Sequence, residues 1–133
     1  IQGVDSLKLL KEIDKQAAKC GRVIDCLLQI HIATEETKFG LDEQELSSLL
    51  ASPDLAAMKH VRIKGLMGMA SFSDDQDLLK KEFTVIRTLF QRYGKDWTVL
   101  SMGMSSDYKL AVTEGSTMVR VGSLLFGARN PVA

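Results

Sequence analysis

Val61-Arg-Ile-Lys-Gly-Leu-Met-Gly-Met-Ala70 decides the fold, because it is a run of strand length rich in β-branched and apolar residues. After it, apolar residues recur at helical spacing until Gly94. Those apolar residues are Leu79, Phe83, Ile86, Phe90 and Tyr93. A second strand-like run, Thr98-Val-Leu-Ser-Met102, follows directly. The order strand, helix, strand predicts a parallel crossover unit buried on both faces of its sheet.

The same alternation continues on both sides of this unit. The further predicted helices start after Ser6 and end at Gly21, start at Asp42 and are stopped by Pro53, and run from about Asp107 to Val112. The further predicted strands are Val23–Ile32 and Thr117–Val121, and Ile1–Val4 resembles the end of another strand. The fold class is therefore α/β, with a parallel sheet of four main strands and alternating helices. We expect a single domain over residues 1–133.

Two capping boxes are predicted at helix starts. Asp42 with Glu45 marks one, and Ser73 with Gln76 marks the start of the long helix. The acidic residues Asp74, Asp75 and Asp77 fit the positive end of that helix dipole better than they fit a metal.

Composition excludes several classes of protein. The chain has 133 residues, of which 45% are hydrophobic and 26% are charged, as is typical of a globular domain. Its 17 Lys and Arg balance 17 Asp and Glu, so the formal net charge is zero. Zero net charge argues against a partner that is a nucleic acid or a membrane surface. The length is too short for a complete (βα)8 barrel, which needs roughly 250 residues.

The cysteines predict neither a disulfide nor a metal site. Cys20 and Cys26 are six residues apart, and His31 and His60 lie far from each other in the sequence. We expect two reduced thiols, with Cys26 buried in a strand. No apolar run approaches the ~18 residues of a membrane span, and no basic leader precedes an apolar run. The expected location is the cytoplasm.

Two glycine-containing turns are candidates for binding an anion. Gly103-Met-Ser-Ser106 and Gly122-Ser123 each follow a predicted strand. Backbone amides at the carboxyl ends of parallel strands can hold a phosphate, and glycine allows the anion to approach closely. On spacing alone the signal is weak, and ordinary turns are the favoured explanation of these residues.

A buried cation is a stronger indication of an anion site than the two glycine-containing turns are. Arg120 interrupts an otherwise apolar strand, and a buried guanidinium must be paired. It either binds a carboxylate on a neighbouring helix or faces an anionic ligand. Ser101 is a hydroxyl in the adjacent apolar strand, bonded to the backbone or offered to a ligand. Alternation places Ser101 with Gly103, and Arg120 with Met118 and Gly122, and we assign both sets to the interior.

Four methionines, Met67, Met69, Met102 and Met104, lie near strand ends, where they either line an aromatic ring or fill the core. His31 is interpreted as a half-buried, hydrogen-bonded residue. Lys38 is interpreted as a solvated loop lysine.

Leu100-Ser-Met-Gly-Met-Ser-Ser-Asp107, Gly115-Ser-Thr-Met-Val-Arg-Val-Gly-Ser123 and Phe126-Gly-Ala-Arg129 together resemble the pyridoxal-phosphate homeostasis protein family. That family shares its fold with the N-terminal domain of alanine racemase. Further matches, in the family's order, are Val4-Asp-Ser-Leu7, Leu27-Leu-Gln-Ile-His-Ile32, Glu36-Thr-Lys-Phe-Gly40 and Gly65-Leu-Met67.

The resemblance implies a (βα)8 barrel of which this chain is the C-terminal half, a partial barrel lacking the N-terminal strands. It implies pyridoxal 5′-phosphate as the cofactor and a role in vitamin B6 homeostasis without a turnover reaction. The implied cofactor-binding residues are Ser101, Arg120, Gly122 and Ser123, with no catalytic residue and no metal ligand. The family's cofactor lysine lies in a Val-Ser-Lys-Thr type motif, which this sequence does not contain.

Two other functions remain open from the sequence. One is a half-site of a fold type III racemase or decarboxylase, for which Tyr93 and Tyr108 are poor catalytic candidates because they lie on predicted helices. The other is a structural fragment that binds no cofactor. A half barrel would leave apolar strand edges exposed at Val23–Ile32 and Thr117–Val121. The expected partners are therefore a second copy, as a homodimer, or the missing N-terminal half.

Overall fold

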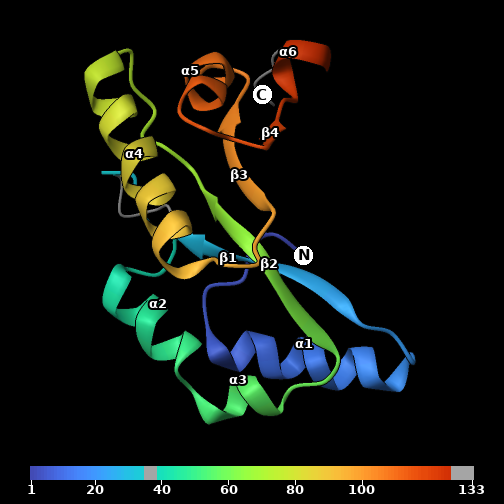
Figure 1. Ribbon diagram of the computed structural model, residues 1–133. Helices are drawn as coiled ribbons and strands as arrows, with labels where there is room; N and C mark the ends of the chain where they lie inside the picture. The colour runs from blue at the N-terminus through green and yellow to red at the C-terminus, as the bar shows by residue number, and fades with distance from the viewer. Residues whose placement is uncertain (35–38, 127–133) are drawn as a thin grey trace.

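A computed structural model describes residues 1–34 and 39–126. The strands are β1 (Ile24–Ile30), β2 (Val61–Gly68), β3 (Val99–Met104) and β4 (Met118–Arg120). The helices are α1 (Leu7–Lys19), α2 (Glu43–Leu50), α3 (Pro53–Ala57), α4 (Gln76–Tyr93), α5 (Tyr108–Thr113) and α6 (Ser123–Phe126). In Figure 1, α1 to α5 form an arc around the strands, and α6 lies beyond β4.

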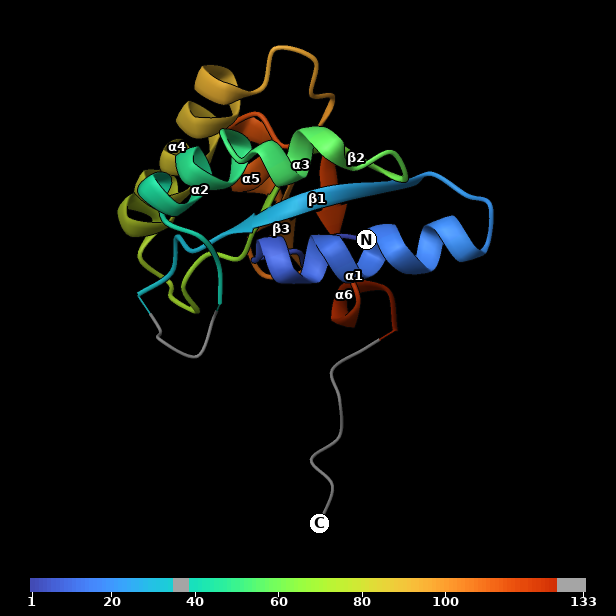
Figure 2. The same cartoon turned by 90° about the horizontal axis from the view of Figure 1, so that it is seen from below.

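The four strands form one parallel sheet in the order β1-β2-β3-β4, as the sequence predicts. Their apolar side chains meet those of the helices in one core, which includes Leu28, Leu66, Phe83 and Leu100. Figure 2 shows β1 running between α1 on one side and α2 and α3 on the other. Cys26 is buried in β1, as predicted, and burial raises the pKa of its thiol.

The N-terminal segment pairs with β1, so the interpretation of Ile1–Val4 as a strand end is confirmed. Val4 forms a parallel bridge with Leu28. The backbone N–H of Gln29 donates to the Val4 carbonyl at 2.7 Å, and that of Leu27 donates to the Ile1 carbonyl at 2.8 Å. This segment covers the outer edge of β1. The prediction of a free apolar edge at Val23–Ile32 is therefore wrong.

Two predicted helix boundaries are also wrong. Pro53 does not stop a helix; α2 already ends at Leu50, and Pro53 starts α3, where a missing backbone N–H costs nothing. The start of α4 is capped by Asp75 instead of by a box of Ser73 and Gln76. The Asp75 carboxylate accepts hydrogen bonds from two backbone N–H groups of the first turn. The other predicted box, Asp42 with Glu45, is present.

β2 and β3 approach each other closely at Gly65. A Cβ atom at this position would lie 1.6 Å from the carbonyl oxygen of Val99. No side chain fits there, and the absence of one lets Gly65 pair with Val99 in the parallel ladder.

Candidate anion site at the strand ends

The carboxyl ends of β2, β3 and β4 surround a hollow of about 770 Å³, called here the strand-end hollow. Its lining consists of Met69–Phe72 after β2, Met104–Asp107 after β3, and Arg120, Gly122, Ser123 and Phe126 from β4 and α6. Two smaller hollows, of about 490 and 260 Å³, lie on the outer side of α4 and beside α1. Ligands of parallel α/β proteins bind at carboxyl ends of strands, so the strand-end hollow is the candidate site.

Arg120 brings an incompletely satisfied cation to this hollow. Its Nη2 donates to the Gly68 carbonyl at 2.7 Å, which ties the end of β4 to the end of β2. Its Nε is buried and has no hydrogen-bond partner among the described residues. Burial lowers the pKa of Arg120 from its ordinary value, and nearby Asp107 acts in the opposite direction. An arginine stays charged at neutral pH, so an anion beside it would gain both charge and a donor.

Arg120 forms no ion pair with a carboxylate in the described part of the chain, although the charge of Asp107 at the start of α5 raises its pKa. The described carboxylates form ion pairs with four other basic side chains, and none of these pairs involves Arg120. Asp107 is the acid whose charge raises the pKa of Arg120. Its carboxylate accepts a hydrogen bond from the Met104 backbone N–H at 2.7 Å.

The turn from β3 into α5 places two serines at the hollow. Gly103 adopts φ +103°, a conformation that favours glycine, and a Cβ there would lie 2.7 Å from the Ala111 Cβ. Ser105 and Ser106 follow this turn. The Gly122 backbone N–H donates to Ser105 Oγ at 3.1 Å, which joins the segments after β3 and β4. The sequence singled out both turns, and the structure brings them side by side.

Ser101 lies apart from the other predicted site residues. Arg120, Gly122 and Ser123 all line the hollow, but Ser101 does not. The Ser101 side chain is fully buried, and its hydroxyl donates to Gln2 Oε1 at 2.8 Å. Gln2 Nε2 in turn donates to Met118 Sδ at 3.4 Å, so one N-terminal side chain contacts both β3 and β4 on one face. The contact of Gln2 was not predicted.

The four methionines divide between the two proposed roles. Met69 and Met104 line the hollow, and Met104 is 43% exposed. Met67 and Met102 are buried, Met102 within the main core. Only the first pair is therefore placed to contact a ligand.

The loop after β2 is held by a residue that sequence reasoning missed. Glu82 of α4 is buried and accepts hydrogen bonds from the backbone N–H and the hydroxyl of Ser71. A signal was present, because Glu82 lies three residues after Leu79 and four before Ile86, on the buried side of the helix.

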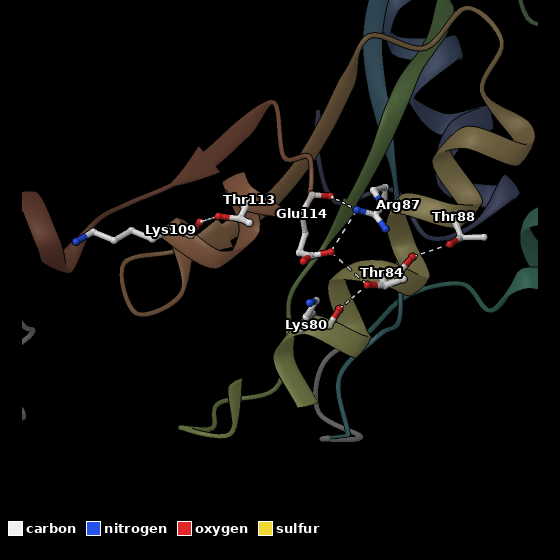
Figure 3. Close-up of polar contacts among 7 residues, drawn as sticks. All are labelled: Lys80, Thr84, Arg87, Thr88, Lys109, Thr113 and Glu114. Atoms are coloured by element: carbon white, nitrogen blue, oxygen red, sulfur yellow. Dashed lines mark hydrogen bonds and ion pairs between the residues drawn. The ribbon is translucent and has the colours of Figure 1, made fainter. Parts of the chain in front are cut away.

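A second buried carboxylate joins α4 to α5 (Figure 3). Glu114 Oε2 lies 3.2 Å from Arg87 Nη1 and accepts a hydrogen bond from the Thr84 hydroxyl at 3.3 Å. This contact lies at the carboxyl end of α5, whereas the hollow lies at its amino end. Its role is to hold the two helices together.

Within residues 1–34 and 39–126, no helix is long and apolar enough to cross a membrane. The same residues contain no cluster of three or more His, Cys, Asp or Glu side chains arranged to hold a metal. Lys38 lies outside the described residues. The Tyr93 hydroxyl donates to Glu43 Oε1 at 3.1 Å, away from the strand-end hollow.

Two relatives with similar sequences share the same name. The pyridoxal phosphate homeostasis protein of Helicobacter pylori is 36% identical over 95% of this chain and 56% of its own length. The protein of the same name from Aquifex aeolicus is 34% identical over 97% of this chain and 58% of its own. The chain thus spans little more than half the length of the relatives it matches.

Solved structures repeat the fold. PipY of Synechococcus elongatus, solved with pyridoxal phosphate bound, superposes with a TM-score of 0.82 at 35% identity, over 96% of this chain and 60% of PipY. Alanine racemase of Bartonella henselae superposes at 0.65 with 17% identity, over 97% and 36%, and shows the likeness of fold alone. The family model described as "Alanine racemase, N-terminal domain" matches residues 1–130. With nearly every residue inside that match, the chain belongs to the family of the alanine racemase N-terminal domain.

Proposed function

We propose that this chain binds pyridoxal 5′-phosphate in the strand-end hollow and serves cellular homeostasis of that cofactor. The observation that carries the proposal is the buried Nε of Arg120, a donor on a charged group that no described residue satisfies. Buried polar groups without a partner are rare in native proteins, so this unpaired donor indicates that an anion binds beside it. The name shared by the relatives and the cofactor bound to PipY support the same ligand.

The lining residues fit both parts of the cofactor. A phosphate monoester needs a cation and N–H or O–H donors, which Arg120 and Ser123 supply, and Gly122 leaves the anion room to approach. The pyridine ring needs a flat apolar wall, which Met69, Phe72 and Met104 supply. The volume of about 770 Å³ lies within the usual range of small-molecule sites.

The contacts that we propose are noncovalent. Bound pyridoxal phosphate offers an aldehyde that reacts with a lysine amine. No lysine lines the hollow within the described part of the chain. This chain's own residues would therefore bind and orient the cofactor.

We further propose that the sheet is the C-terminal half of a (βα)8 barrel. The sequential parallel order of β1 to β4 is the order of barrel strands. Gln2 lies at one edge of the sheet and contacts Ser101 and Met118 near the other, which requires a strongly curved sheet. The chain also covers 60% of PipY and 36% of the alanine racemase.

A titration tests the proposed binding without interference from surface lysines. Pyridoxine 5′-phosphate has the ring and phosphate of the cofactor but no aldehyde, and pyridoxine lacks the phosphate as well. We expect the phosphate ester to bind at least about tenfold more tightly than pyridoxine, because charged hydrogen bonds contribute ~1.5–3 kcal/mol. Amide NMR shifts should change around Arg120 and Ser123. Equal affinities, or shift changes elsewhere in the sheet, would contradict the proposal.

The open edge of the sheet leads to a separate proposal, that a second copy of the chain covers β4. Among the described strands, β4 pairs only with β3. Met118 of β4 is 39% exposed, and Leu125 and Phe126 of the following α6 are 68% and 88% exposed. An unpaired strand edge favours pairing with another chain, and the zero net charge opposes it little.

Light scattering at several concentrations tests this second proposal. We expect the mass of two chains, falling toward one on dilution, because the interface is noncovalent. A single-chain mass at every concentration would exclude the dimer.

A further inference from the structure

Glu82 makes a pair of short hydrogen bonds to Ser71. The helix α4 does not need these bonds in order to form. The residue is 5% exposed, and its Oε1 and Oε2 accept from the backbone N–H and the hydroxyl of Ser71, both at 2.6 Å. Burying a carboxylate costs free energy unless donors satisfy it, and bonds to an ionised acceptor are short and strong. Glu82 therefore fixes the loop after β2 rigidly to α4.

The same contact reaches the loop after β1. Ser71 Oγ accepts the backbone N–H of Thr34 at 2.8 Å, and the Thr34 hydroxyl lies 3.0 Å from it. Because the Ser71 hydroxyl gives its proton to Glu82, it acts toward Thr34 as an acceptor. One buried carboxylate thus orders the loops that follow two neighbouring strands.

The loop held in this way supplies part of the apolar lining of the strand-end hollow. Ser71 lines the hollow together with Met69 and Phe72, while Arg120 and Ser123 approach it from β4. Arg120 extends from β4 across the end of β3, and its guanidinium reaches the Gly68 carbonyl at the end of β2. The loop held by Glu82 begins directly after Gly68 and brings Met69 and Phe72 to the hollow beside this cation.

We propose that Glu82 is a positioning residue for the ring of the ligand, acting through Ser71. This inference rests on the proposed function, since it assigns two groups of residues that line the same hollow to two parts of one ligand. Glu82 holds the wall for the ring, and Arg120 holds the phosphate.

The test measures binding of the ring and binding of the phosphate separately, using the 133-residue chain. Glu82→Ala should raise the Kd for pyridoxine 5′-phosphate about tenfold, because the wall loses two charge-assisted bonds, but should change the Kd for inorganic phosphate less than about twofold. Hydrogen exchange at the Ser71 amide should accelerate in the same variant.

The conservative variant should restore the wall. In Glu82→Gln, the amide oxygen accepts the Ser71 N–H and the amide nitrogen donates to Ser71 Oγ, whose proton turns toward Thr34. We expect pyridoxine 5′-phosphate affinity within about threefold of the unaltered chain, since both hydrogen bonds to Ser71 are kept. If a negative charge were required at position 82, Glu82→Gln would not restore this affinity.

Glu114→Ala is the matched control. It also removes a buried carboxylate, one that contacts Arg87 and Thr84 and no lining loop (Figure 3). We expect lower stability but unchanged affinity for both ligands. If Glu82→Ala does not fold, Ser71→Ala replaces it, with about a threefold loss for pyridoxine 5′-phosphate alone.

Three results would overturn the inference. One is unchanged pyridoxine 5′-phosphate affinity in folded Glu82→Ala, or in Ser71→Ala if that variant replaces it. Another is an equal loss for both ligands. The third is no binding of either ligand by the unaltered chain, which would overturn the proposed function too; the first two results leave that function standing.

Discussion

Arg120→Gln is expected to weaken binding of pyridoxine 5′-phosphate by about 1.5–3 kcal/mol, or about tenfold to a hundredfold. The guanidinium lines the strand-end hollow, and its buried Nε has no described partner. Glutamine removes the charge and the forked set of donors together. Affinity for pyridoxine, which has no phosphate, should not change. Isothermal titration with both ligands measures the difference.

Two further variants sharpen this result. Arg120→Lys keeps the charge but presents a point cation in place of a planar fork, so its affinity should fall between those of the other two forms. Arg62→Gln is the control, because Arg62 pairs with Asp25 on the exposed surface of β1 and β2, outside the lining. Unaltered phosphate-ester affinity in a folded Arg120→Gln variant would refute the assignment.

Gly65→Ala is expected to give the largest loss of stability, at least about 4 kcal/mol, which is a large part of the roughly 5–15 kcal/mol that stabilises a domain. The new Cβ would lie 1.6 Å from the Val99 carbonyl oxygen and 2.6 Å from its carbon. Neither atom can move without breaking the pairing of β2 with β3, which lie in the middle of the sheet. Urea unfolding followed by circular dichroism measures the change.

Gly3→Ala provides the comparison for Gly65→Ala. A Cβ at Gly3 would lie 3.5 Å from Gln29 Oε1, which is ordinary contact. The free energy of unfolding should therefore change by less than about 0.5 kcal/mol. Equal stability of the Gly65→Ala and Gly3→Ala chains would mean that β2 and β3 do not approach each other as described.

Apolar periodicity accounts for the parts of the fold that could be predicted. The long helix was located by residues from Leu79 to Tyr93, and it ends before Gly94 as expected. The errors arose where one residue type serves two purposes. A proline both stops helices and starts them, and Pro53 does the second. Ser73 and Asp75 are both good caps, and only the path of the chain selects Asp75.

In the site, strand alternation placed Ser101 and Met118 on one face, where both contact Gln2, but it did not indicate how deep a residue lies. It failed at Gly103, where an added Cβ would point at Ala111 of α5, because the register shifts between Ser101 and Met104. The strand predicted to stop at Met102 continues to Met104. Ser101 therefore lies three residues before the end of β3, below the rim, where it contacts Gln2. Arg120 is the last residue of β4 and lies at the rim. Glu82 was missed because acidic residues on helices are normally solvated, and its buried neighbours outweigh that tendency.

The contacts of Gln2 impose an order on how the chain acquires its shape during synthesis. β1, β2 and β3 each pair with the strand made just before or after, so these pairings can form as the polypeptide leaves the ribosome. The side-chain contacts of Gln2 cannot form so early, because the partners of Gln2 lie 99 residues later at Ser101 and 116 residues later at Met118. Closing so long a loop costs chain entropy that shorter pairings do not. The contacts of Gln2 across the sheet can therefore form only after β3 and β4 have been made.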